Sequence, residues 1–251
     1  MSTVYSSPSG NGRGSEAWWV PWTHFKVDRR SPSDCRVTFD HPPTNTLTAT
    51  TVAELGELVG LIEQDRDLNV VVFDSANPDF YLVDCEIEND PGRPAAVGVG
   101  PVAADAWLDV LDRLSRAPVL SIASVRGRAR GAGSEFVLAC DLRFASRENS
   151  LLGQLDVGTD VVAAGGPMAR LPPLVGRGRA LEILLVADDL DGPRAERYGY
   201  VNRVIADGEL DLEVDAIASR LAQIDHDAIA RTKAHVDQVD RRRHSSNQLR
   251  P

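Results

Sequence analysis

The sequence predicts an α/β fold built around a largely parallel sheet. Two runs, NVVVF at 69–73 and PVLSIASV at 118–125, are mostly apolar and rich in β-branched residues. That composition is typical of strands buried on both faces. Residues 48–65 and 102–115 instead repeat apolar side chains at the spacing of an amphipathic helix. Strands alternating with helices favour βαβ units, and therefore a parallel sheet.

The other elements follow from the same signals. The segment CRVTF (35–39) predicts a strand that ends in the Pro/Asn turn HPPTNT (41–46). We expect a further strand over 80–83, a short helix over 133–140 and a strand over 141–146. After residue 150 the pattern becomes helical. Helices are expected at 163–172, 177–186, 193–198, 211–223 and 227–239.

Composition divides the chain into four parts. Residues 1–16 are Ser/Gly-rich and are predicted to be a disordered tail. A core domain over 17–205, a C-terminal helical region over 206–240 and a loose tail over 241–251 follow. The cluster Trp18, Trp19 and Trp22 is expected to anchor the tail to the core domain, and an aromatic binding surface is the alternative.

Charge and cysteine usage exclude several classes of partner. The formal net charge of −10 argues against duplex nucleic acid or an anionic membrane, because both require a cationic face. No run approaches the roughly 20 apolar residues of a membrane span, and no signal peptide is visible. Three separated cysteines predict reduced thiols in a cytoplasmic protein. No histidine pair has metal-ligand context, so we expect no metal.

The segment from Arg126 to Arg170 carries the clearest chemical pattern. A buried strand passes through the small-residue loop Gly131-Ala132-Gly133 directly into a helix. Backbone N–H groups gather at such a helix start, and small side chains let a ligand approach them closely. Glu135 adds a carboxylate in the first turn. An oxyanion stabiliser beside a general acid/base suits carbonyl chemistry, whereas a tight turn with a helix-stabilising acid is the alternative.

From about Cys35 to Val239 the chain resembles the enoyl-CoA hydratase/isomerase, or crotonase, family. The matching sequence segments, in the family's order, are HPPTNTLT, NVVVFDS, PVLSIASVRGRARGAGSEFVLACDLRFAS, GQLDVG and AERYGYVNRVI. The resemblance implies a spiral of ββα turns with a C-terminal helical trimerisation region, in a homotrimer or hexamer. Family members continue past the helix that ends near Val239, so we expect an open pocket or rearranged subunit contacts here.

The resemblance also implies roles for individual residues. Backbone N–H groups of Val83 and Ala132 would form the oxyanion hole. Glu135 matches the family's first catalytic glutamate, and Asp156 stands where the second one does. No separate cofactor is implied, since coenzyme A would enter as part of the substrate. Substrate-binding positions are expected at Leu82, Gly131 and Gly133.

Two departures from the family pattern bear on the substrate. Asp160 replaces the usual glycine, so it is either a turn residue or a further catalytic acid/base. The run from Asp84 to Asp90 holds four acids in seven residues, where relatives commonly have a basic residue. Such a run repels a polyanion and weakens the inference of coenzyme A. Candidate phosphate partners are Arg93, Arg128 and Arg130.

Three functions are compatible with this sequence. The first is hydration, dehydration or isomerisation of an enoyl thioester by a lyase or isomerase. The second is a dehydratase, isomerase or cyclase of specialised biosynthesis that acts on a carrier-bound or non-CoA substrate. The third is a non-catalytic subunit that retains the fold.

Overall fold

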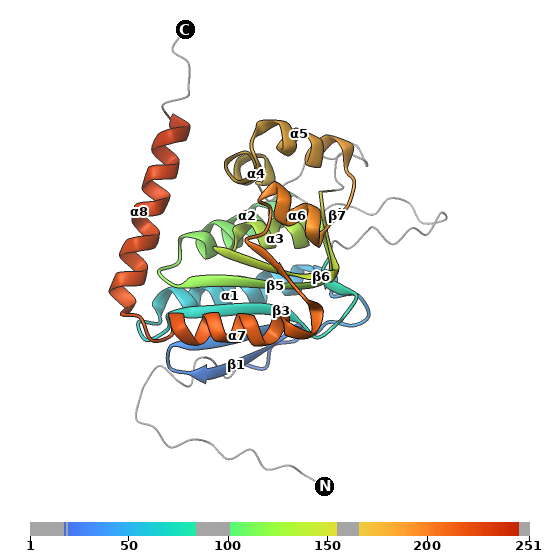
Figure 1. Ribbon diagram of the computed structural model, residues 1–251. Coiled ribbons are helices and arrows are strands. Elements are labelled where there is room, and N and C mark those ends of the chain that lie inside the picture. The colour runs from blue at the N-terminus through green and yellow to red at the C-terminus, as the bar shows by residue number, and fades with distance from the viewer. Residues whose placement is uncertain (1–17, 19, 84–100, 155–165, 246–251) are drawn as a thin grey trace.

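The computed structural model describes residues 18, 20–83, 101–154 and 166–245, and these residues form one eight-stranded sheet covered by helices (Figure 1). The sheet order is β1-β2-β3-β5-β6-β7, with β4 paired to β5 and β8 paired to β6. The strands are β1 (Phe25–Ser31), β2 (Asp34–Phe39), β3 (Val70–Ser75), β4 (Phe80–Leu82), β5 (Leu120–Arg130), β6 (Leu142–Gly153), β7 (Leu190–Asp191) and β8 (Arg203–Ile205).

The helices lie close to their predicted positions. None of the helices in the described part of the chain is long and apolar enough to cross a membrane. The described helices are α1 (Ala49–Gln64), α2 (Pro101–Arg116), α3 (Ala132–Ala139), α4 (Pro167–Val175), α5 (Arg177–Val186), α6 (Gly192–Tyr198), α7 (Leu210–Leu221) and α8 (His226–Ser245), with a short 3-10 turn at Asp207–Glu209.

The parallel centre of the sheet is confirmed, and its edges differ from the prediction. Strands β2, β3, β5 and β6 pair in parallel. The pairs β1–β2 and β6–β7 are antiparallel. Strand β1 was not predicted, because its FKVDRRS text buries alternate residues on one face only and so lacks a continuous apolar run. Strands β7 and β8 are two and three residues long, too short for a periodic signal.

The C-terminus also departs from the prediction. Helix α8 continues to Ser245, into the segment 241–251 that we expected to be loose. Arginine, which occupies positions 241–243, is a good helix former. Figure 1 shows α8 extending away from the sheet. It is held near its start by Ile229, which is buried, and by Lys233, whose Nζ donates to Asp141 Oδ2 at 2.8 Å.

Alternate residues of β3 enter two separate cores. Val71 and Phe73 belong to the large cluster shared with α1, α2 and α3. Val70 and Val72 face the other way and pack with residues of α7. This burial on both faces explains why the sequence of the strand is continuously apolar. Of the three cysteines, Cys35 and Cys140 are buried and free, and Cys85 lies outside the described residues.

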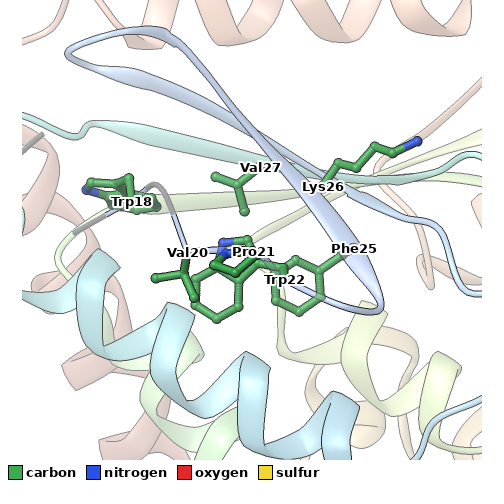
Figure 2. Close-up of a pocket in the computed structure, with 7 residues that line it drawn as sticks. All are labelled: Trp18, Val20, Pro21, Trp22, Phe25, Lys26 and Val27. Carbon is green, nitrogen blue, oxygen red and sulfur yellow. The ribbon is translucent and has the colours of Figure 1, made fainter. Parts of the chain in front are cut away.

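The two described tryptophans at the start of the core domain pack onto it. Trp18 is buried and its Nε1 donates to Asp65 Oδ2 at 3.1 Å, while Trp22 stacks on Phe25 with ring centroids 5.1 Å apart. Between them lies a pocket of about 320 Å³, also lined by Lys26 and its neighbours (Figure 2). These two side chains therefore pack on the core domain, whereas their predicted role as an anchor for the tail stays a prediction. Trp19 and the tail 1–16 lie outside the described residues.

Candidate active site

Helix α3 begins in the interior of the protein, where β5 ends. Its N-cap is Gly131, whose φ of 51° and ψ of −120° are readily adopted only by glycine. The Gly131 N–H donates to Gly153 O at 3.1 Å, which ties the helix start to the end of β6. All eight residues of α3 are buried. The first N–H groups of a helix have no acceptor within it, so the start of α3 presents donors and partial positive charge inside the molecule.

A glycine brings β4 against this helix start. A Cβ placed on Gly133 would lie 1.7 Å from the carbonyl oxygen of Leu82, the last residue of β4. Sequence reasoning assigned the small side chains of the loop to close approach by a ligand. At Gly133 the structure supplies another reason, because the chain's own backbone occupies that space. The contact therefore places Leu82, the residue before Val83, against Gly133, the residue after Ala132.

Val83, the predicted second oxyanion donor, already has a backbone partner. Its N–H donates to Asn45 O at 3.3 Å, and its carbonyl accepts from Leu47 N at 2.8 Å. The first distance lies beyond the usual 2.7–3.2 Å range for N–H···O bonds. The N–H of Val83 is therefore held by the longer of these two bonds, and it would have to leave Asn45 O to donate to a ligand.

Asn45 holds this region together, although sequence reasoning gave it no role. It is buried, and its φ of 53° is tolerated better by asparagine than by most residues. Its Nδ2 lies 2.8 Å from Ser75 Oγ and 3.2 Å from the carbonyl oxygens of Phe80 and Tyr81. One amide thus joins the HPPTNT turn to β3 and β4. The available signal was an asparagine closing a Pro-Pro turn.

Glu135 is buried with one of its carboxylate oxygens bound to an indole. The residue is 4% exposed, and its Oε2 accepts a hydrogen bond of 2.7 Å from Trp107 Nε1 of α2. Trp107 is also buried, and its ring stacks on Phe136, the residue after Glu135. Sequence reasoning placed Trp107 in a helix but assigned it no function.

A second polar contact holds α3 on its other side. Ser134 Oγ is hydrogen-bonded to the hydroxyl of Tyr200, and both residues are fully buried. Burial raises the pKa of Tyr200 to about 12. Arg143 donates to Tyr200 O at 2.8 Å and to the carbonyl oxygen of Cys140, the C-cap of α3, at 2.7 Å. Helix α3 is therefore fixed by polar contacts as well as by apolar packing.

Several predicted residues lie outside the described part of the chain, namely Asp156, Asp160, the acidic run 84–90 and Arg93. Two of the arginines suggested for phosphate binding are described. Arg130 forms an ion pair with Asp189, in which its Nε lies 2.8 Å from Oδ1. Arg128 places its guanidinium over the ring of Phe80, 5.3 Å from the centroid. Arg130 is therefore engaged within the protein.

Comparison with known proteins identifies the fold and the family. A protein-family model described as enoyl-CoA hydratase/isomerase matches residues 30–250. The short-chain-enoyl-CoA hydratase of Clostridium acetobutylicum is 30% identical over 190 residues, which cover 74% of this chain and 70% of that protein. The crotonyl-CoA hydratase of Syntrophomonas wolfei is also 30% identical over 190 residues, 76% of this chain and 72% of that protein.

Similar solved structures lead to the same family. A putative enoyl-CoA hydratase from Streptomyces avermitilis has a TM-score of 0.76 and 39% identity, covering 88% of this chain and 79% of that one. Pseudomonas aeruginosa DspI has a TM-score of 0.78 and 25% identity, covering 86% and 87%. The fold is therefore that of the crotonase-type α/β proteins, with helices at the C-terminus. The chain belongs to the enoyl-CoA hydratase/isomerase family, a family of enzymes.

Proposed function

We propose that this protein catalyses hydration, dehydration or isomerisation of an enoyl thioester, with Glu135 as a proton-transferring group. The observation that carries the proposal is the buried carboxylate of Glu135 in the first turn of α3. The same turn begins with the backbone donor of Ala132. A carboxylate next to preorganised N–H groups is the arrangement that carbonyl-activated proton transfer requires.

In the hydration direction, the N–H groups of Ala132 and Val83 polarise the thioester carbonyl. The oxygen of a water molecule adds to the β-carbon, the water proton passes to a carboxylate, and the negative charge moves onto the carbonyl oxygen. A second carboxyl group then protonates the α-carbon as the carbonyl re-forms. Glu135 and Asp156 are the proposed pair, with Asp160 as the alternative partner. For Val83 to take part, its N–H exchanges the carbonyl oxygen of Asn45 for the carbonyl oxygen of the substrate as its acceptor.

Chain connectivity supports Asp156 as the partner. The residue is three positions beyond Gly153, whose carbonyl binds the helix start through Gly131. Three residues of chain span at most roughly 10 Å. This short separation along the chain favours Asp156 over Asp160, which is seven positions beyond Gly153, as the proposed partner.

The proposed substrate is an acyl-CoA, because the relatives at 30% identity are named as hydratases of CoA thioesters. Coenzyme A is then part of the substrate, and no separate cofactor is proposed. The acidic run from Asp84 to Asp90 favours a second candidate, an enzyme acting on a carrier-bound or non-CoA substrate, because it repels the phosphates of coenzyme A.

Hydration of crotonyl-CoA, followed by loss of the enoyl absorbance, tests the first function. We expect the Glu135→Gln variant to lose about 10²–10⁴-fold in kcat, the usual contribution of a general acid/base. Glu57→Gln is the control, since Glu57 is exposed on α1. Full activity in Glu135→Gln would contradict the role of Glu135. Faster turnover of crotonyl-pantetheine than of crotonyl-CoA would favour the second function.

A further inference from the structure

Helix α2 contributes one side chain, Trp107, that contacts two consecutive residues of α3. Its indole Nε1 lies 2.7 Å from Glu135 Oε2. Its ring lies nearly parallel to that of Phe136, with an interplanar angle of 21° and a centroid separation of 6.2 Å. Trp107 is 2% exposed, so both contacts are made in the interior. The indole is therefore held by two contacts, a hydrogen bond to the carboxylate and a stack on an aromatic ring of the core.

The aromatic core holds this indole in place. Phe136 packs edge-on against Phe39 of β2, at 5.4 Å and 82°, and against Phe73 of β3, at 4.9 Å and 81°. Edge-to-face pairs at these separations are favourable, and close-packed side chains cannot turn without opening a void. Rotation of Trp107 away from Glu135 would also break its stack on Phe136. The N–H group is thus directed at the carboxylate by the packing of the sheet.

The chemistry of the donor determines what the contact does. An indole N–H can donate a hydrogen bond but cannot accept one, so it cannot replace the carboxyl group in proton transfer. Hydrogen bonds to an ionised acceptor are shorter and roughly twice as strong as neutral ones, so a fixed donor favours the ionised carboxyl. Burial acts in the opposite direction, because it disfavours charge. At Glu135 the indole offsets part of that cost.

We propose that Trp107 is a positioning residue for Glu135: its N–H fixes the orientation of the carboxylate and biases it towards the ionised form. This inference deepens the proposed function and rests on it for the catalytic consequence. The contact itself rests on the geometry of α2 and α3 alone. The two can therefore be tested separately.

The variant Trp107→Phe removes the N–H and retains an aromatic ring that can pack on Phe136. With crotonyl-CoA as substrate, we expect kcat to fall by about 10–100-fold while KM stays within about threefold, since misplacement of a catalytic group by about 1 Å costs up to 10²-fold. The limb of the pH–rate profile governed by Glu135 should move upward by about one pH unit, because the variant lacks a donor to the ionised form.

Trp18→Phe is the matched control. It removes another indole-to-carboxylate bond, from Trp18 Nε1 to Asp65 Oδ2, which is partly buried. Trp18 precedes β1, and Asp65 is the C-cap of α1. A general loss of stability would lower the melting temperature of both variants, whereas only Trp107→Phe should move the pH profile. Unchanged kinetics in Trp107→Phe, with an active wild type, would overturn the proposal.

A measurement without turnover completes the test. The wild-type protein has four tryptophans, so the indole N–H resonance absent from Trp107→Phe identifies Trp107 in ¹H–¹⁵N spectra. We expect this resonance to shift with pH in the wild type and to lose that titration in Glu135→Gln. A resonance that is insensitive to pH in the wild type would refute the contact. An inactive wild type with a titrating resonance would instead sink the proposed function and keep the indole–carboxylate contact.

Discussion

At the scale of single residues, the candidate site depends on the absence of a side chain at Gly133. The position that its Cβ would take lies 1.7 Å from the carbonyl oxygen of Leu82, far inside any van der Waals contact. This close approach places the end of β4 against the start of α3, next in the chain to the two proposed oxyanion donors, Val83 and Ala132. The same glycine therefore serves packing and the proposed oxyanion hole together.

We predict that Gly133→Ala separates β4 from α3. Overpacking of this kind typically costs about 1–3 kcal/mol, and here the obstructing atom is backbone and cannot rotate away. Activity should fall by about 10²-fold or more, because the two donors would no longer converge. Chemical denaturation and hydration of crotonyl-CoA measure the two effects.

Gly178→Ala is the matched control for that substitution. Gly178 lies in the first turn of α5, and a Cβ there would have no neighbour within 4 Å. Alanine is favoured over glycine in a helix by up to about 1 kcal/mol, so this variant should be slightly more stable and fully active. Equal losses in both variants would contradict the argument from the Leu82 contact.

At the scale of elements, the start of α1 is joined to the HPPTNT turn through a pair of histidines. The rings of His24 and His41 stack with centroids 3.8 Å apart. His24 Nδ1 lies 2.6 Å from Thr51 Oγ1, at the N3 position of α1, and the backbone of Thr23 and His24 donates to Glu54. Burial, together with the neighbouring His41, lowers the pKa of His24, while Glu54 acts in the opposite direction.

This lowered pKa predicts a loss of stability in acid. Below its ordinary pKa near 6.5, the unfolded chain takes up a proton at His24 more readily than the folded one, so the free energy of unfolding falls as the pH drops through that region. Above pH 6.5 the penalty is absent. The melting temperature should therefore decrease less between pH 7 and pH 5 in His24→Gln than in the wild type. For a chain of this length, each 1 kcal/mol change in the free energy of unfolding shifts the melting temperature by about 2–4 °C.

His235→Gln, on an exposed position of α8, should retain the wild-type pH dependence of the melting temperature. Parallel pH curves for the wild type and His24→Gln would show that His24 does not carry the effect.

The elements also show what a sequence pattern can and cannot predict. Strands β3 and β5 were predictable because burial on both faces leaves a continuous apolar run, whereas β1 buries one face and β7 has two residues. Glu135 and Ala132 could be selected because a small-residue loop, a helix start and a carboxylate are adjacent in the chain. Trp107 could not, because its bond to Glu135 joins positions 28 residues apart, and helical periodicity indicates only that Trp107 is buried.

At the scale of the whole molecule, exposed apolar side chains are concentrated on two neighbouring helices. Among the described residues, nine large hydrophobic side chains are exposed, and five of them lie on α4 and α5: Met168, Leu174, Leu181, Leu185 and Val186. Figure 1 shows the two helices side by side at one end of the molecule. Clusters of this kind on soluble proteins mark interaction surfaces. The family resemblance implies a trimer or hexamer, and we propose that α4 and α5 contact a second copy of the chain.

We therefore predict that the purified protein is a homo-oligomer, and that Leu185→Lys with Val186→Lys shifts it towards the monomer. These side chains are 60% and 59% exposed, so the double substitution should leave the core and the melting temperature of the monomer nearly unchanged while placing two charges in an apolar interface. Light scattering coupled to size-exclusion chromatography measures the molar mass. Leu212→Lys supplies the control, because Leu212 is 74% exposed on α7, away from α4 and α5. If the double variant keeps the wild-type molar mass, assembly uses another surface; if Leu212→Lys also dissociates the oligomer, the effect comes from added charge rather than from the α4–α5 face.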